Sequence, residues 1–343
     1  SDRDLHADLS DLPALDWSLI DTRRYILKNV YQQKMLHTFT SKGCIGSCGY
    51  CYNPSFSRGI WRPRSMQAVL NEMHELARGY DVQAVTFVDD LLRPDKDSLS
   101  AFCKTIKREG PDLYWGCDLC ADSVTREELE EMYDAGCRWI FFGIESGSSE
   151  MQKIIKKNLD LHKAKTTLEI WKEIGICTTT SFIVGFPDET KEDLKQTVAY
   201  ANSLPSDVKV AFSFGPIPTT LLYRRLVNEK RLKACDEDPS LGTRCWFDFY
   251  GENYTVVPAV DCKVIVSCFY FAMMASQIRF GGEEKKHWGK RFVSQIGDML
   301  RMKSLRGMKR LCLSVLLFSK ILFYSLAFPR IRKEYGLQLR RRG

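Results

Sequence analysis

The segment that decides the fold of this chain is the short loop Cys44-Ile45-Gly46-Ser47-Cys48-Gly49-Tyr50-Cys51, which follows a strand-like run. Its glycines, with Gly43 before them, let the backbone fold tightly around a metal centre. Three thiolates at this spacing can each reach one iron of a cubane cluster, whereas structural zinc usually takes four protein ligands. The nearest histidines, His37 and His74, lie on the preceding strand and in the following helix. The loop therefore predicts an iron–sulfur cluster with one iron left open, rather than three unrelated cysteines.

The composition fits a globular protein of one large domain or two smaller ones. The chain has 343 residues, of which 44% are hydrophobic and 27% charged. No secretory signal precedes the loop, so a disulfide framework is not expected for the 13 cysteines. Six others lie in apolar runs, where Cys behaves as a small buried hydrophobe: Cys103, Cys117, Cys137, Cys177, Cys268 and Cys312.

Strand-like and helix-like segments alternate from residue 35 to residue 229, and this order predicts about six β–α units on a parallel sheet. Eight units close a full barrel, so six imply an open, partial (β/α)6 barrel. Expected strands cover residues 35–40, 82–88, 113–120, 137–144, 178–186 and 208–214. Expected helices cover residues 65–78, 95–109, 125–135, 149–174 (two helices), 191–204 and 221–229.

The alternation divides the chain into three parts. Residues 1–35 form an N-terminal linker segment, residues 36–231 form the core barrel, and residues 232–343 form a mostly helical extension with apolar helices at 263–280 and 311–328. In parallel α/β folds, ligands bind at the carboxyl ends of the strands. We therefore expect the functional residues of the core just after its strands.

The Cys-x-x-x-Cys-x-aromatic-Cys pattern, with Tyr50 before the last cysteine, resembles the signature of the radical S-adenosylmethionine (SAM) superfamily. The resemblance implies that Cys44, Cys48 and Cys51 hold a 4Fe-4S cluster whose open iron binds SAM. Reductive cleavage of SAM would then give a radical that abstracts hydrogen from a substrate, with an external electron donor such as flavodoxin or ferredoxin. The alternative is a non-catalytic iron–sulfur protein for electron transfer or sensing, which needs no SAM pocket.

The resemblance also assigns residues to SAM at the strand ends. Asp89 and Asp90 resemble the family's acidic SAM-amino motif, where a carboxylate accepts hydrogen bonds from the methionyl ammonium. Their alternative role is to cap the next helix. Glu145 and Ser146 lie in Gly143-Ile144-Glu145-Ser146-Gly147, and Glu145 is expected to point into the barrel mouth, either toward SAM or toward a structural arginine.

Two further strand ends resemble family segments. Gly185 begins Gly-Phe-Pro-Asp-Glu-Thr, after Ile183 and Val184, which the resemblance places near adenine. Thr219 stands where a Pro-x-Pro-Gly-Thr segment usually has Gly. Cys120 also departs from the family pattern, because Arg is usual there and a neutral thiol cannot pair with a carboxylate. Either another residue supplies the positive charge, or Cys120 has its own role as a packed thiol, a radical quencher or an extra ligand.

The branch of the superfamily is indicated by residues 11–17, which resemble the linker that joins a cobalamin domain to the barrel in cobalamin-binding radical SAM enzymes. That branch includes methyltransferases and ring-forming enzymes, several of which act on lipids or tetrapyrroles. This chain contains no Asp-x-His-x-x-Gly cobalamin motif. Cobalamin binding is therefore expected only together with an upstream domain. No catalytic side chain and no substrate can be named from the sequence.

The C-terminal run 311–328 is apolar apart from Lys320 and has basic flanks. A charge near the centre of a bilayer costs about 2.5–3.5 kcal/mol on insertion scales, so a full span is not expected. The run fits a helix packed against the open side of the barrel, or a peripheral membrane contact that would suit a lipid substrate. We expect a cytoplasmic protein, with or without this membrane contact, that acts on a small molecule or lipid and not on nucleic acid.

Overall fold

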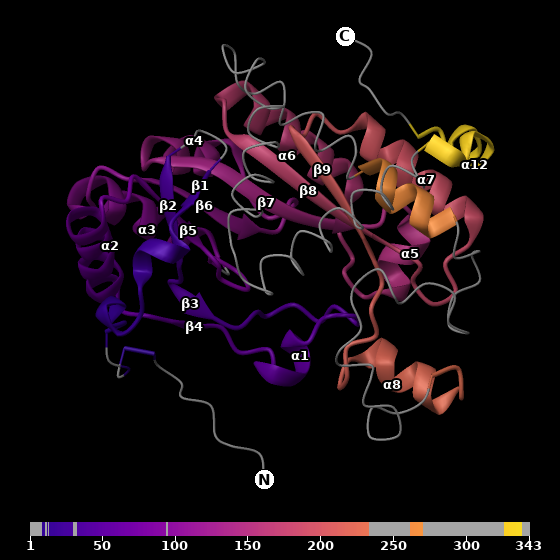
Figure 1. The fold of residues 1–343 in the computed structure, drawn as a ribbon, viewed down its shortest axis with the longest axis horizontal. Coiled ribbons are helices and arrows are strands. Elements are labelled where there is room, and N and C mark those ends of the chain that lie inside the picture. The colour runs from indigo at the N-terminus through magenta and orange to yellow at the C-terminus, as the bar shows by residue number, and fades with distance from the viewer. Residues whose placement is uncertain are drawn as a thin grey trace, which may run out of the picture.

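The fold is built on one seven-stranded sheet, seen here in a computed structural model that describes residues 9–10, 12, 14–29, 33–93, 95–232, 261–269 and 326–337. The strands follow the order β1-β2-β5-β6-β7-β8-β9, and all neighbours from β2 to β9 pair in parallel. These six parallel strands curl into a half-barrel (Figure 1), which confirms the predicted partial (β/α)6 barrel. The strands are β1 (Leu27–Lys28), β2 (Lys34–Thr38), β5 (Ala84–Phe87), β6 (Tyr114–Leu119), β7 (Cys137–Glu145), β8 (Cys177–Val184) and β9 (Val208–Ser213).

The described helices are α1 (Asn53–Phe56), α2 (Met66–Tyr80), α3 (Lys96–Glu109), α4 (Arg126–Asp134), α5 (Ser149–Ile154), α6 (Leu161–Ile174), α7 (Lys191–Ser203), α8 (Leu221–Asn228) and α12 (Pro329–Glu334). The helices of the core, α2 to α8, lie close to the expected ranges and begin at side-chain caps, whereas α1 and α12 were not expected and have no side-chain cap. Ser65 caps α2 and Asp95 caps α3, while Thr125 opens α4 in the expected capping box with Glu128. Each cap satisfies an N–H group that the helix itself leaves unpaired.

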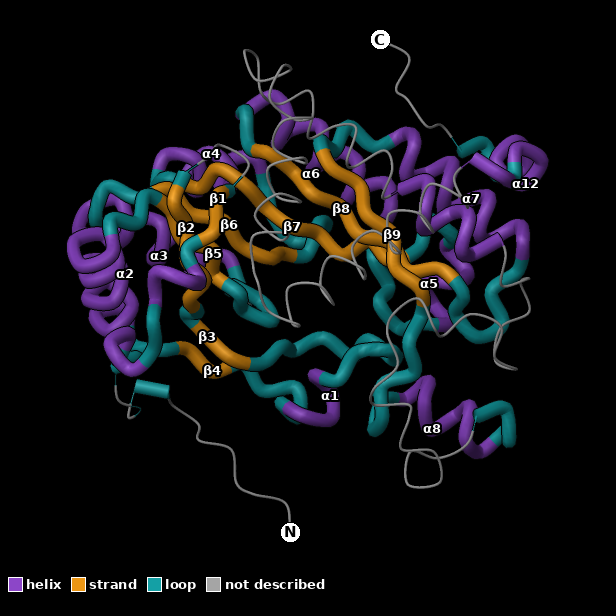
Figure 2. Tube along the Cα trace, viewed as in Figure 1, coloured by secondary structure: helices purple, strands orange, loops and turns teal. Residues whose placement is uncertain are grey.

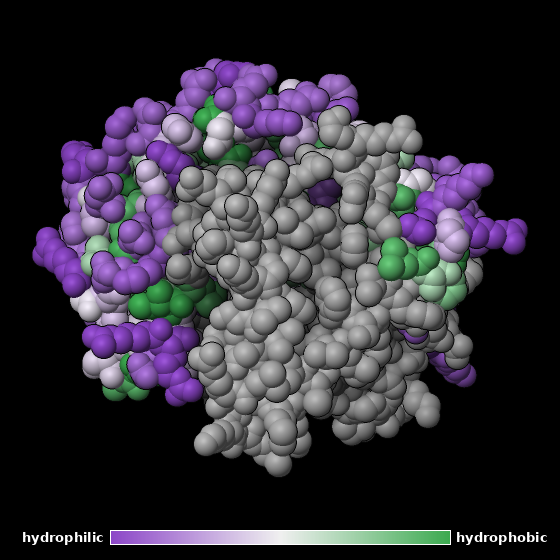
Figure 3. All heavy atoms as spheres, turned by 45° about the horizontal axis from the view of Figure 1, so that its top comes forward, coloured by the Kyte–Doolittle hydropathy of each residue, from purple (hydrophilic) through white to green (hydrophobic). Residues whose placement is uncertain are grey.

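Helices cover one face of the sheet and bury it in a large apolar core. Leu129 of α4, Trp171 of α6 and Val198 of α7 belong to the same buried cluster as Phe87 and Trp115 of the strands. The tube drawing shows the strands as one twisted layer beside these helices (Figure 2). Where described residues are visible in Figure 3, hydrophilic side chains cover much of the surface, as expected for helices with one polar face. The other face of the sheet is concave.

A second, two-stranded sheet and two helices lie along the edge of the half-barrel (Figure 1). β3 (Ser41–Lys42) pairs antiparallel with β4 (Arg62–Pro63), and α1 lies between them in sequence. Two backbone hydrogen bonds hold this insertion against the carboxyl ends of the strands. Gly49 N–H donates to the Ile155 carbonyl (2.7 Å), and Leu222 N–H donates to the Gly49 carbonyl (2.9 Å). The cysteine loop is thus fixed to both α5 and α8.

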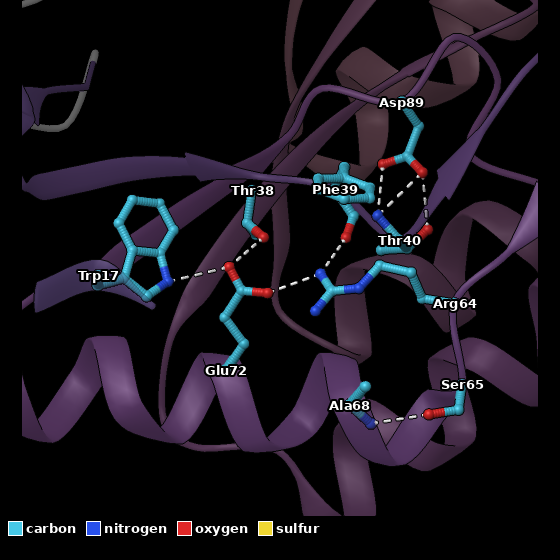
Figure 4. A network of polar contacts seen from close by, with 9 residues as sticks. All are labelled: Trp17, Thr38, Phe39, Thr40, Arg64, Ser65, Ala68, Glu72 and Asp89. Carbon is cyan, nitrogen blue, oxygen red and sulfur yellow. Dashed lines mark hydrogen bonds and ion pairs between the residues drawn. The ribbon is translucent and has the colours of Figure 1, made fainter. Parts of the chain in front are cut away.

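A buried ion pair anchors the end of this insertion, just after β4 (Figure 4). Arg64 Nη1 lies 2.6 Å from Glu72 Oε2 of α2, and it also donates to the Phe39 carbonyl at the end of β2. Glu72 Oε1 accepts hydrogen bonds from Thr38 and from the Trp17 indole of the N-terminal segment. Because both charges are satisfied in a buried site, removal of one partner would leave the other unpaired.

Several predictions fall only partly within the described residues. Five of the six cysteines expected in apolar runs are buried, and Cys312 lies outside the described residues. The expected helix at 263–280 is described over residues 261–269, and most of the run 311–328 lies outside. Among the described helices, none has the length and hydropathy to cross a membrane. The boundaries at residues 35 and 231 remain predictions.

Candidate functional site

The three cysteines of the loop lie together between β3 and α1. Cys44, Cys48 and Cys51 are half-buried, and burial first, then the neighbouring thiols, raises the pKa of both Cys44 and Cys51. Backbone groups already point at two sulfurs: Gly46 N–H donates to Cys44 Sγ (3.3 Å) and Asn53 N–H donates to Cys51 Sγ (3.4 Å). Donors of this kind stabilise the thiolates that iron requires.

Glycines make room for the loop at two points. A Cβ atom at Gly43, where φ is +93°, would lie 2.1 Å from the Ile60 carbonyl oxygen. A Cβ at Gly46 would lie 3.3 Å from Cys44 Sγ and 3.9 Å from Cys48 Sγ, which is where a cluster would sit. Among the described residues, no three Cys, His, Asp or Glu side chains converge on one point as ligands of a single ion. A cubane cluster binds each thiolate through a different iron, so three separate thiols in one loop fit such a cluster.

The acidic pair at the end of β5 holds the loop in place. Asp89 is buried and accepts hydrogen bonds from Thr40 N–H (3.0 Å), Thr40 Oγ1 (2.9 Å) and Ser41 Oγ (2.5 Å). Asp90 accepts from Gly43 N–H (2.9 Å) and the Tyr52 hydroxyl (2.7 Å). Burial opposes the charged form of Asp90, but its hydrogen bonds outweigh burial and lower its pKa. The predicted alternative of a helix cap is wrong for both residues, because Asp95 caps α3.

The carboxylate at the end of β7 faces a lysine instead. Glu145 has a positive φ of +67°, next to a register shift between β7 and β8, and this strained backbone sets the direction of its side chain. Lys157 Nζ lies 3.4 Å from Glu145 Oε1, and both side chains are mostly buried (14% and 10% exposed). Burial opposes the charged form of Lys157, but Glu145 and then Cys48 outweigh it and raise its pKa. The expected structural arginine is thus a lysine.

Lys157 is the functional residue that sequence reasoning missed. Cys120 also contributes to the raised pKa of Lys157, and Cys120 stands at the position where the family usually has Arg. The Cys120 thiol donates to Asp122 Oδ1 (3.1 Å), and burial first, then Asp122, raises its pKa to about 11. Cys120 is therefore a neutral thiol, and Lys157 supplies the positive charge at this place. The only signal in the sequence was the departure at Cys120, because the Lys156-Lys157-Asn158 run resembles an ordinary solvated turn.

The other residues that the resemblance assigns to SAM binding lie in the mouth of the half-barrel or support it. Tyr50 packs edge-on against Phe186 with centroids 5.6 Å apart, and burial followed by the charge of Glu145 raises its pKa. Ile183 is half-buried at the end of β8 beside the cluster that contains Phe186. Gly185, with φ of +82°, donates its N–H to the buried Glu189 carboxyl. Ser146 is fully buried and bonded to Thr197, so it supports the loop after β7.

The segments that follow β8 and β9 start the next helices. Thr190 caps α7 in a capping box with Asp193, and Asp188 pairs with Arg225 and Arg231. Thr219, which replaces the usual Gly, has a φ of +74°. Glycine adopts this left-handed conformation without strain, whereas a side chain such as that of Thr219 does so at a cost.

The fold and site define a class: an α/β half-barrel with a three-thiol loop and an ion pair at the carboxyl ends of its strands. Residues 38–201 match the family model of the radical SAM superfamily. This chain therefore carries a radical SAM domain.

Its curated relatives include methyltransferases and cyclases. It is 27% identical over 221 residues to an uncharacterized methyltransferase of Pyrococcus horikoshii (64% of this chain, 48% of that protein). It is 24% identical over 213 residues to the anaerobic magnesium-protoporphyrin IX monomethyl ester cyclase of Rubrivivax gelatinosus (62% of this chain, 38% of that protein). The chain thus spans less than half the length of these relatives.

Two solved structures share the fold. OxsB, a cobalamin-dependent SAM radical enzyme, matches with a TM-score of 0.55 at 15% identity, over 86% of this chain and 46% of that one. TsrM, a radical SAM methyltransferase of Kitasatospora setae solved with cobalamin and a [4Fe-4S] cluster, matches with a TM-score of 0.53 at 18% identity, over 58% of this chain and 37% of that one.

Proposed function

We propose that this protein reductively cleaves SAM at a 4Fe-4S cluster held by Cys44, Cys48 and Cys51, and uses the resulting radical to abstract hydrogen from a substrate. The observation that carries the proposal is the loop itself. It brings three half-buried thiols together at the strand ends, with backbone N–H groups aimed at two of them. When bound, the cluster supplies the electron and an open iron for SAM.

The residues around the loop would bind and orient SAM. Lys157 is a donor for a carboxylate, and Glu145 is an acceptor for an ammonium or a hydroxyl group; each is a charge-assisted contact. Asp90 is half-buried beside the loop, where it accepts from Gly43 N–H, and Asp89 acts through Thr40 and Ser41. Tyr50 and Ile183 add apolar surface that excludes water from the mouth.

The proposal extends to the outcome of the reaction. Methylation and ring formation are the chemistries named for the relatives, and either would follow from a substrate radical. Cobalamin would enter only with an upstream domain. An external flavodoxin or ferredoxin would supply electrons, and the substrate would be a small molecule or lipid.

The test is anaerobic reconstitution with iron and sulfide, followed by reduction with dithionite in the presence of SAM. We expect about four irons per chain and formation of 5′-deoxyadenosine. Replacement of Cys44, Cys48 and Cys51 by Ala should remove the iron, the charge-transfer absorbance and the product. Cys103→Ala, a buried thiol on α3, is the matched control and should keep all three.

Two results would contradict the proposal. A triple variant that keeps its cluster would show that other residues bind the iron. A wild-type cluster that is reduced but neither binds nor cleaves SAM would favour the electron-transfer or sensor alternative.

A further inference from the structure

The concave face of the sheet carries a carboxylate that the proposed chemistry does not use. Trp115, Cys117 and Leu119 of β6 point into the helical side, where the Trp115 ring lies 5.6 Å from Phe102 of α3. Side chains alternate along a strand, so Gly116 and Asp118 point to the concave side. Trp139 of β7 marks the same side, since a Cβ at Gly116 would lie 1.9 Å from its indole nitrogen.

The surface around Asp118 is apolar and partly open. Asp118 pairs in register with Phe141 of β7, which is partly exposed. Val88, next to it at the end of β5, is 46% exposed, although most valines are buried. The Trp139 indole is held in place by a hydrogen bond to Thr86 Oγ1 (3.1 Å). A concave apolar surface with one carboxylate is typical of a small-molecule site.

Asp118 differs from the other carboxylates at this edge because no described residue donates a hydrogen bond to it. Burial first, and then the charges of Asp89 and Asp90, raises its pKa to about 7. By contrast, Asp89 and Asp90 each accept several hydrogen bonds, and Glu145 faces Lys157. Because a buried carboxylate is costly without a donor, a ligand that donates a hydrogen bond or carries a positive charge would find a ready acceptor in Asp118.

We propose that Asp118 is a substrate-binding carboxylate and that it selects a substrate with a cationic nitrogen next to an apolar or aromatic group. The nitrogen would lie against Asp118, and the apolar group would lie against Val88, Trp139 and Phe141. The negative charges of Asp89 and Asp90 favour a cation here and repel an anion. This inference names the substrate class of the proposed function and rests on that function.

The experiment compares two probes of similar shape, benzylamine and benzyl alcohol, on the reconstituted protein with SAM present. Ligand-observed NMR titration gives the two dissociation constants. We expect wild type to bind benzylamine about tenfold more tightly, and Asp118→Asn to remove most of this preference. Phe141→Ala should weaken both probes and keep the preference. Asp134→Asn, an exposed residue of α4 paired with Lys107, is the matched charge control and should bind as wild type does.

A second variant keeps the test valid if Asp118→Asn does not fold. Val88→Lys, at an exposed position, would place an ammonium beside Asp118 and should also abolish the preference. Equal binding of both probes by wild type, or a preference that survives in either variant, would overturn the proposal. If Asp118→Asn instead weakens SAM about tenfold, Asp118 faces a cationic group of SAM and the substrate assignment is wrong. Because probe binding needs no turnover, these outcomes are distinct from a failure of SAM cleavage.

Discussion

The ends of β5 and β7 both place acidic side chains beside the cysteine loop, but their surroundings differ. At β5, the protein itself supplies the hydrogen-bond donors. Asp89 accepts from Thr40 and Ser41, and Asp90 accepts from Gly43 and Tyr52. At β7, Glu145 has two partners, Lys157 at 3.4 Å and the Tyr50 hydroxyl, and it stands on a strained backbone. A fully bonded carboxylate fixes a loop, whereas an ion pair with spare donors and acceptors can exchange its partner for a ligand.

This comparison predicts separate effects on stability and on binding. A change at Asp89 should destabilise the loop and leave SAM affinity nearly unchanged. A change at β7 should alter SAM affinity, and it should cost stability only where it leaves a buried charge unpaired. The predictions below follow this division, from the largest expected effect to the smallest.

The largest effect is expected for Lys157→Met. Loss of one partner from a buried ion pair costs about 3–5 kcal/mol, because Glu145 is left unpaired. Chemical denaturation should show this loss, and SAM affinity should fall as well. The double variant Lys157→Met/Glu145→Gln should recover most of the stability but not the affinity. Recovery of both would show that Lys157 has no role in SAM binding.

Smaller effects are expected for two further variants: Glu145→Gln should lower SAM affinity, and Asp89→Asn should lower stability. Glu145→Gln should weaken SAM binding by about 1.5–3 kcal/mol, the range for a lost charge-assisted hydrogen bond. Asp89→Asn should instead lower the free energy of unfolding by about 1–3 kcal/mol, because Thr40 or Ser41 loses its acceptor. Isothermal titration and denaturation of both variants give the four numbers. A large loss of SAM affinity in Asp89→Asn would mean that Asp89 binds SAM directly, as the sequence resemblance suggested.

The smallest effect is expected for Thr219→Gly, near the start of α8. A non-glycine residue in the left-handed region costs about 1–2 kcal/mol, so glycine should raise the free energy of unfolding by about 1 kcal/mol. The midpoint of denaturation should rise with an unchanged slope. The neighbouring Thr220→Gly is the control, and it should not stabilise because it removes the N-cap of α8. If Thr219→Gly is no more stable, side-chain contacts of Thr219 offset the strain.

The sequence predicted the elements well because their signals are local. Hydrophobic spacing and caps such as Ser65, Asp95 and Thr125 depend on residues only a few positions apart. The caps also set the limits of these predictions. A helix cap was the alternative role for Asp89 and Asp90, but Asp95 caps α3, and their partners are about 40 to 50 residues away in the chain.

By itself the sequence determined the half-barrel, the cysteine loop and the position of the site at the strand ends, because alternating β–α units and a three-cysteine motif are patterns within short windows. Only the tertiary structure decided which charges meet. It brought Lys157 to Glu145 and Cys120, gave Asp89 to Thr40 and Ser41, and left Asp118 without a donor among the described residues. Such pairings depend on the curl of the sheet, which brings distant strand ends together, and no local pattern encodes them.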